Sequence, residues 1–478
     1  MKLKIDARQA SLFDFLDLAV LEDPVQEAPA CKSEIQAAVY DVVKPQRPRR
    51  QLFVLQDEML AHLSSDSAKI EANIKAIETL RTLRAEGRMV ATDEEKRAMV
   101  AFSGWGGLSN VFAEKTSHPQ AQQRLRELLT PAEYDGALES VLSAYYTEPS
   151  VVRAIWSIVQ RMGFKGGRVL EPSCGTGNFI GAMPEEIRHE SRVVMIDPDP
   201  ITATLADELY ADRQTTVMPI GLQDLGSREN GRFDLVIGNA PFGNYRVSDA
   251  RLDKLKLNIH NYFLIKSIEL VRPGGIVALI TTSSTLENGS REFLAHLCSR
   301  AELKMAIRLP SAAFARLGGT DVVADVLILQ RRHKSVEVGP WDNNFELPNK
   351  ANPAREYCTA NYTYWVESSK VNALFVKNPH WVLGKYSLAS NRWGTRLGVE
   401  AHDDWQERLM ALSEEACIQG TFDSTINVSD GPVQRVADPK GLKSYVAHGF
   451  FFDEEGRLML IDGSNGVSDT ENYPAHQL

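Results

Sequence analysis

The chain has 478 residues, of which 43% are hydrophobic and 24% charged, a composition typical of folded soluble proteins with two or three domains. No apolar run reaches the roughly 18–20 residues that a membrane-spanning helix needs, and the five cysteines are scattered without a C-x-x-C pair. We therefore exclude a membrane protein, a disulfide framework and a metal site, and expect a cytoplasmic protein. The formal net charge of -10 does not indicate nucleic-acid binding, although a local basic groove is compatible with it.

The N-terminal third divides into an arm and a helical region. Residues 1–50 are proline-rich around one short helical stretch, so we expect a flexible arm. Residues 51–140 should be helical. Two patterns predict helices there. One is a capping box at Thr92 and Glu95. The other is an apolar stripe with i, i+3/i+4 spacing, formed by Ile70, Ile74, Ile77, Leu80 and Leu83.

The arm contains a short segment, QASLFDF, that has the form of a linear binding peptide. It resembles the Q-x-x-L-F peptide with which bacterial replication and repair proteins bind the sliding clamp. The resemblance implies that Leu12 and Phe13 fill an apolar pocket while Gln9 bonds at its edge. An amphipathic helix start that packs on the domain is the alternative interpretation.

The rest of the chain changes pattern twice. In residues 141–335 apolar runs such as SRVVMID, FDLVIGN and GGIVALITT alternate with helical stretches, which predicts a doubly wound α/β sheet. Residues 336–478 are irregular and rich in tryptophan and tyrosine, and we expect a smaller C-terminal domain there.

The segment RVLEPSCGTGNFIG joins a predicted strand to a predicted helix through Gly175 and Gly177, which permit positive φ and a close approach of a ligand. The loop begins with Glu171 and has no lysine, so it suits a cationic ligand better than a pyrophosphate. The next strand ends at Asp197, where a carboxylate can accept from paired ribose hydroxyls. A glycine turn that only packs a helix on the sheet is the alternative.

A second loop, DLVIGNAPFGNY, follows a later strand. Asn239 offers a carbonyl acceptor, and Pro241 constrains the direction of the Ala240 carbonyl, so two acceptors can converge on a primary amino group. Phe242 can stack on a planar base that carries this amine. Such a site would hold an exocyclic amine while a methyl group is delivered in line. A turn that merely ends the strand is again the alternative.

Together, EPSCGTGNF and GNAPFG resemble the motifs of the S-adenosylmethionine (AdoMet)-dependent N6-adenine DNA methyltransferases of the γ type. FSGWGGLSNVF, AYYTEPSVVRAIW and RLPSAAFARLGGTDVVADVLILQRR are similar to one branch. This is the methyltransferase half of the large methyltransferase–helicase proteins of bacteriophages and conjugative elements, some of them linked to antirestriction. The likeness covers residues 70–390. It implies a class I AdoMet-dependent methyltransferase fold with a Rossmann-like sheet, and a C-terminal domain that recognises DNA.

The resemblance also implies roles for individual residues. Asn239, Ala240, Pro241 and Phe242 would form the catalytic loop, with Phe242 and Phe314 on the two sides of a flipped adenine. The cofactor residues would be Thr147 at the methionine carboxylate, the loop of Glu171, Gly175 and Gly177, and Asp197 at the ribose.

The sequence departs from the family pattern at two positions. Ala240 replaces the usual first proline, and we expect activity to survive because the carbonyl does the work. Gly221 occupies the position of the acid that holds the AdoMet adenine, and Gln223 or Asp224 would have to replace it.

We therefore expect methyl transfer from AdoMet to adenine N6 in DNA, with a helicase or a restriction component as a further partner. Two alternatives stay open. One is an RNA or protein amide methyltransferase of the same fold, and the other is a catalytically weak DNA-binding protein of a mobile element.

Overall fold

The computed structural model describes residues 53–336 with five gaps of one or two residues, most of 371–419, and three short strands beyond residue 449. The clamp-like segment with Gln9, Leu12 and Phe13 lies outside the described residues, as does most of the C-terminal region. Among the described helices, none combines the length and apolar character that crossing a membrane requires.

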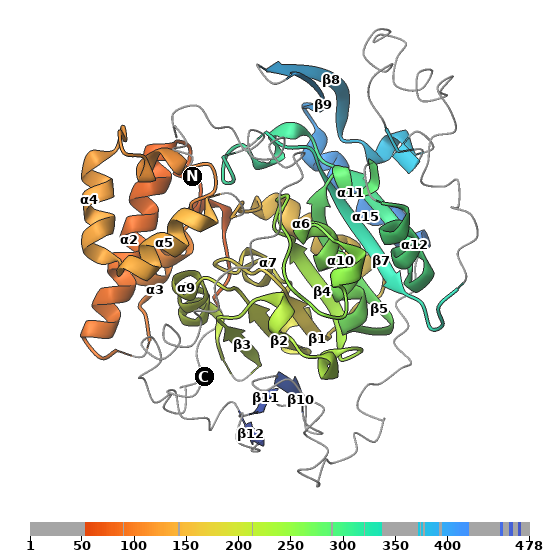
Figure 1. Ribbon diagram of the computed structural model, residues 1–478, viewed down its shortest axis with the longest axis horizontal. Coiled ribbons are helices and arrows are strands. Elements are labelled where there is room, and N and C mark those ends of the chain that lie inside the picture. Colours follow the sequence, from red (N-terminus) through yellow and green to blue (C-terminus); the bar gives the residue numbers. More distant parts are fainter. Residues whose placement is uncertain are drawn as a thin grey trace.

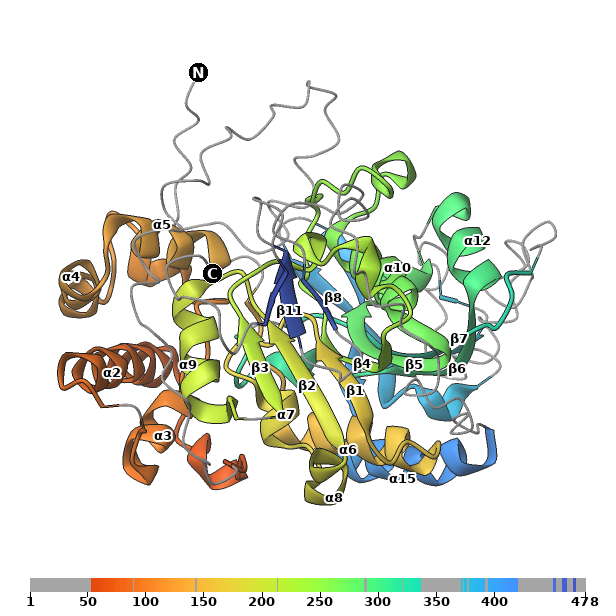
Figure 2. The ribbon, with the colours of Figure 1, turned by 90° about the horizontal axis from the view of Figure 1, so that it is seen from below.

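The described part of residues 51–140 contains four α-helices: α2 (Asp66–Ala85), α3 (Asp93–Val100), α4 (Pro119–Leu128) and α5 (Pro131–Ser140). The predicted apolar stripe of α2 is buried along its whole length. The predicted capping box is present too, because the Thr92 hydroxyl accepts from the N–H of Glu95 while the Glu95 carboxylate accepts from the N–H of Thr92. In Figure 1 and Figure 2 these helices lie together on one side of the molecule, next to α9 (Pro200–Tyr210).

The centre of the molecule is a seven-stranded sheet with the order β3-β2-β1-β4-β5-β7-β6. All strands run parallel except β7, which is antiparallel to both neighbours. A mostly parallel sheet whose strand order reverses beside β1 is a doubly wound α/β sheet, so the predicted α/β architecture is confirmed. The strands are β1 (Gly167–Glu171), β2 (Ser191–Ile196), β3 (Thr215–Met218), β4 (Phe233–Asn239), β5 (Val271–Thr282), β6 (Ala301–Arg308) and β7 (Ala324–Arg331).

Helices cover both faces of the sheet. In Figure 2, α10 and α12 lie above the sheet, while α6, α8 and α15 lie below it. The bounds of these and the remaining helices are α6 (Pro149–Arg161), α7 (Asn178–Gly181), α8 (Glu185–His189), α10 (Ile259–Leu270), α11 (Ser284–Glu287), α12 (Arg291–Arg300) and α15 (Trp405–Gln419).

The described part of the C-terminal region begins at the edge of this sheet. Val382 forms a parallel bridge with Arg308 of β6, and α15 packs against α6. A hairpin of β8 (Gly384–Asn391) and β9 (Gly394–Ala401) follows this contact. The last strands, β10 (Phe450–Phe452), β11 (Leu458–Ile461) and β12 (Val467–Asp469), form a separate antiparallel sheet.

The strand order locates the site. The chain proceeds from β1 outward to β3, and then returns to β4 on the other side of β1. Loops at the carboxyl ends of β1 and β4 therefore diverge and leave a crevice between them, which is where open α/β sheets bind ligands. Both loops identified in the sequence begin at this crevice, after Glu171 and after Asn239.

Candidate active site

A cavity of about 170 Å³ occupies the crevice at the carboxyl ends of β1, β2 and β4. Five segments distant in sequence line it: the segment around Trp105, the tyrosine-rich stretch before α6, and the loops after β1, β2 and β4. All four predicted catalytic residues, Asn239, Ala240, Pro241 and Phe242, are among the lining residues. The structure thus brings the two predicted loops to one cavity.

The β1–α7 loop depends on its glycines. Gly175 and Gly177 have φ of 54° and 85°, which side-chain-bearing residues rarely adopt. A Cβ on Gly177 would lie 2.5 Å from the Met195 methyl group and 2.6 Å from the Tyr210 ring. Gly175 lines the cavity, whereas Gly177 lies behind it, against β2 and α9. The two glycines therefore have different roles, one facing the ligand space and the other allowing the loop to pack.

Glu171 presents a carboxylate to the cavity from the end of β1 and is only 1% exposed. Its Oε2 atom is buried and has no hydrogen-bond partner within the part of the chain that the structure describes. Burial raises the pKa of this carboxyl well above its usual value. A buried, half-satisfied carboxyl group is costly alone and is stabilised by a cationic partner, so its chemistry fits the positively charged end of AdoMet.

Asp197 lies at the end of β2, on the same cavity. Its Oδ2 accepts from the N–H of Gly175 at 2.9 Å and its Oδ1 accepts from the N–H of Asp199 at 3.0 Å. Burial, and then the nearby Asp199, raise its pKa to about 7. Each oxygen keeps a second lone pair, so the carboxylate is fixed in place and can still accept from ribose hydroxyls.

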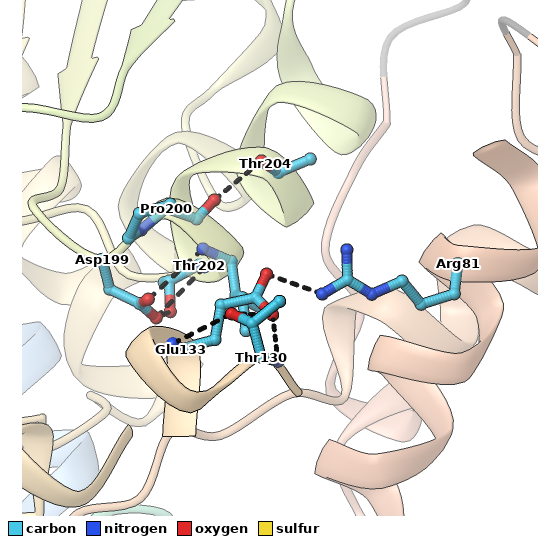
Figure 3. Close-up of polar contacts among 8 residues, drawn as sticks. Arg81, Thr130, Glu133, Asp199, Pro200, Thr202 and Thr204 are labelled. Carbon is cyan, nitrogen blue, oxygen red and sulfur yellow. Dashed lines mark hydrogen bonds and ion pairs between the residues drawn. The ribbon is translucent and has the colours of Figure 1, made fainter. Parts of the chain in front are cut away.

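Residues of the helical region lie close to Asp199, which lines the cavity (Figure 3). Asp199 caps α9 through the N–H groups of Ile201 and Thr202. Glu133, at the start of α5, lies near enough to interact electrostatically with Asp199 and pairs with Arg81 of α2 at 2.6 Å. The residues before the sheet thus help to hold the wall that contains Asp199.

The side chain of Asn239 is oriented by two hydrogen bonds. Its Nδ2 donates to the Tyr145 carbonyl at 3.0 Å and to the Thr147 hydroxyl at 3.2 Å. Its Oδ1 is buried and has no partner among the described residues. The main chain is held as well, since Ser173 Oγ donates to the Asn239 carbonyl at 2.7 Å. A fixed acceptor in a cavity, with its donor end already used, is what binding an amine requires.

The aromatic rings of the site contact one another. Phe242 is buried, and its ring meets that of Phe314 edge to face, with centroids 5.9 Å apart. On its other side Tyr145 lies 6.2 Å away with planes inclined by 32°. A base sandwiched between two parallel rings would separate them by roughly 7 Å, twice the usual stacking contact of about 3.5 Å. The two phenylalanines lie together, but they do not leave this space for a base between them in this structure.

Besides Gly177 and Phe314, two further predicted residues do not line the cavity. Neither Gln223 nor Asp224 lines it. The Asp224 carboxylate instead accepts from the N–H of Gly221 at 2.8 Å, where it closes a short 3-10 turn.

The structure also adds residues that the sequence did not single out, chiefly Tyr145, Asn178 and Tyr245. The doubled tyrosine of AYYTEP was the one available signal for the first of these. Asn178 donates to the Thr147 carbonyl at 3.1 Å, so it supports the residue that holds Asn239.

Comparison with known proteins agrees with this geometry. Residues 194–314, which include the β4 loop and Phe314, match the family of Eco57I restriction-modification methylases. The chain is 27% identical over 274 residues to the defense against restriction protein B of Escherichia phage P1, an alignment that covers 56% of this chain and 10% of that protein. It is 33% identical over 131 residues to modification methylase CviBIII of Paramecium bursaria Chlorella virus NC1A, covering 26% of this chain and 33% of the methylase.

Among solved structures, a class I S-adenosylmethionine-dependent methyltransferase from Listeria monocytogenes is 17% identical, with a TM-score of 0.35, over 60% of this chain and 91% of that one. The strand order of the sheet, and not this likeness, shows the doubly wound α/β fold. The chain spans only about a tenth to a third of the length of the curated relatives described above. AdoMet is the cofactor that the fold and the domain family imply, and Glu171 and Asp197 fit it. Residues 194–314 are therefore similar to the Eco57I restriction-modification methylases, and they lie within the seven-stranded sheet whose crevice holds the cavity.

Proposed function

We propose that the protein transfers a methyl group from AdoMet to the N6 amino group of adenine in DNA. The observation that supports this most strongly is the state of Asn239, whose Nδ2 is held by two acceptors while its buried Oδ1 has no partner. A buried acceptor without a partner costs about 1–3 kcal/mol, and an incoming N–H donor would remove that cost. The site is thus selective for a ligand with an amino group.

In this proposal the β4 loop holds the amine and does not act as a general base. Asn239 Oδ1 and the Ala240 carbonyl accept its two hydrogens, which directs the nitrogen lone pair toward the cofactor side of the cavity. AdoMet supplies a methyl group activated by its sulfonium. With AdoMet bound, the nitrogen held by Asn239 and Ala240 would take the methyl group as the C–S bond breaks, and the methylated nitrogen, which is strongly acidic, would release its proton to water. The rate gain comes from proximity and orientation, and it requires no strong general base.

An adenine in a duplex can reach this loop only if it leaves the base stack. We propose that Phe242 stacks on the extruded base and that Phe314 presses on it after the edge-to-face pair opens. Aromatic stacking contributes about 1–3 kcal/mol per base, comparable to the few kcal/mol that extrusion costs. Thr147 and the cofactor loop would hold AdoMet alongside.

The wider context is also a proposal. The relatives come from viruses and are named for modification and for defense against restriction, which supports a role on DNA of a mobile element, and we propose the cytoplasm as the place of action. A separate helicase or restriction component and, through Gln9, Leu12 and Phe13, the sliding clamp are the partners that we propose.

The test is methyl transfer from tritiated AdoMet to three acceptors: unmethylated DNA, RNA, and protein extract. We expect label in DNA alone, and at least a hundredfold loss in Asn239→Ala with unchanged AdoMet affinity. Asn378→Ala is the matched control, since that side chain also donates to a main-chain carbonyl, of Leu374, but does not line the cavity. Label in RNA or protein would contradict the proposal, and AdoMet binding without transfer to any acceptor would favour a catalytically weak DNA-binding protein.

A further inference from the structure

The loop between β4 and α10, residues 243–258, has a charge distribution unlike that of the whole chain. We call it the rim loop, because it begins directly after the catalytic segment and its Tyr245 lines the cavity while remaining 44% exposed. Although the chain has a net charge of -10, this loop carries more cations than acids. The charged residues are Arg246, Arg251, Lys254, Lys256, Asp249 and Asp253.

Both carboxylates of the rim loop accept hydrogen bonds, from the loop itself or from α10. The Asp249 carboxylate accepts from the Tyr262 hydroxyl at 3.1 Å and from the buried Lys266 ammonium at 3.3 Å, both on α10. Asp253 accepts from the N–H of Asp249 at 2.8 Å. Arg251 is also used internally, since it pairs with Asp249 and with Glu269. These bonds fix the loop on α10, and Lys266 and Arg251 offset the charge of Asp249.

The other three cations, Arg246, Lys254 and Lys256, face outward. All three are exposed, and within the described part of the chain none of them forms an ion pair. Lys256 has φ of 50°, the single positive value at a non-glycine position among the described residues. A left-handed backbone at such a residue costs on the order of 1–2 kcal/mol and is typical of segments whose shape serves a function. The loop therefore displays three cations from a fixed scaffold.

The rim loop also has a suitable position. The Tyr245 carbonyl accepts from the N–H of Ile259 at 2.9 Å, which fixes the rim beside the first turn of α10. A nucleotide that enters the cavity base first keeps its two flanking phosphates outside, at the rim. Arg246 follows Tyr245 directly in sequence, so an exposed cation adjoins a residue that lines the cavity.

We propose that the rim loop is the site that binds the phosphate backbone of the nucleic acid around the extruded nucleotide, through Arg246, Lys254 and Lys256. The inference rests on the proposed function for the identity of the polymer. Phosphate contacts of this kind position the target strand without reading its sequence, and they make the affinity depend on salt.

The experiment compares two variants that each remove three exposed positive charges. The first carries Arg246→Gln, Lys254→Gln and Lys256→Gln. The control carries Arg97→Gln, Lys115→Gln and Lys165→Gln, at exposed positions that do not line the cavity. Binding of an unmethylated 20-base-pair duplex is measured between 50 and 300 mM salt. We expect the first variant to lose about 0.9 per phosphate contact from the slope of log K against log salt, and to bind roughly 10- to 100-fold more weakly at 100 mM salt.

Kinetics provide a second readout, because a backbone contact should raise KM for DNA and leave kcat and AdoMet affinity unchanged. Equal binding by the first variant and wild type, or equal weakening by both variants, overturns the inference. If the triple variant does not fold, Lys254→Gln alone should lower the slope by about 0.9, and an unchanged slope overturns it. If wild type binds the duplex through the rim loop but transfers no methyl group, the proposed function fails and this inference stands.

Discussion

The buried carboxyl of Asp197 should make the stability of the protein depend on pH in a way that one substitution removes. Its pKa is raised from 3.8 to about 7 by burial and by Asp199, so the folded state holds this proton to a higher pH than the unfolded chain does. The resulting stability is complete below about pH 4 and is lost as the pH rises to about 7. A shift of about three units corresponds to about 4 kcal/mol, and partial exposure of the side chain reduces our expectation to about 2 kcal/mol.

Asp197→Asn places a neutral group of the same shape there. The amide keeps one acceptor and loses the other, so either Gly175 or Asp199 gives up its hydrogen bond, at a cost of about 1 kcal/mol at every pH. That offset cancels when two pH values are compared. We therefore expect the difference in unfolding free energy between wild type and variant, measured by urea denaturation, to shift by about 2 kcal/mol in favour of the variant between pH 4.5 and pH 8. Parallel profiles would refute the reasoning.

The remaining predictions concern the cofactor and the packing of the site. AdoMet should bind wild type more tightly as the pH rises through about 7, because the ribose hydroxyls prefer an ionised acceptor, and calorimetry should find this dependence absent in Asp197→Asn. Gly177→Ala should lower the unfolding free energy by about 1–3 kcal/mol, because the added methyl group strains the backbone and meets Met195. Gly136→Ala, in open space on α5, should instead raise the unfolding free energy by about 0.5–1 kcal/mol. Equal effects of the two substitutions would contradict this. Phe314→Ala should cost about 3–5 kcal/mol of stability, while Phe314→Leu should stay folded, bind AdoMet and lose methyl transfer; full activity of Phe314→Leu would exclude the stacking role.

Much of the architecture could be read from local pattern. The α2 stripe, the capping box at Thr92 and the strands that became β1, β2, β4, β5 and β7 all show the periodicity expected of their element. Both loops of the site were also visible, because glycine at positive φ and an asparagine before an X-Pro turn are features of single short segments. Their meeting at one cavity follows from the parallel order of β1 and β4.

Two strands lacked a usable pattern. β3 has only four residues, and β6 carries Lys304 and Arg308, which argue against a buried strand. Arg308 is nevertheless 1% exposed, because Asp325 of the neighbouring β7 pairs with it at 2.8 Å and Glu287 pairs with it as well. The partners lie distant in sequence, so local analysis cannot find the pairing that makes the burial possible.

The same reasoning explains what the sequence missed in the site. Asn239 is oriented by the Tyr145 carbonyl, a main-chain group 94 positions away that any residue could supply. Asp224 illustrates the reverse case, since its position close to Gly221, where the family pattern has an acid, suggested a ligand, whereas its carboxylate caps a turn. The fold determines which main-chain carbonyl accepts a hydrogen bond and which side chain caps a turn. Residue type alone does not predict either.

The central claim is tested most directly by the identity of the methylated nucleoside. Cytosine N4 is also an exocyclic amine that two carbonyl acceptors could hold, so the product distinguishes the base as well as the reaction. Unmethylated DNA is treated with AdoMet and either wild type or Asn239→Ala, digested to nucleosides and analysed by mass spectrometry. The account predicts N6-methyldeoxyadenosine from wild type and a loss of at least a hundredfold in the variant. N4-methyldeoxycytidine, or equal N6-methyldeoxyadenosine from both proteins, would contradict it.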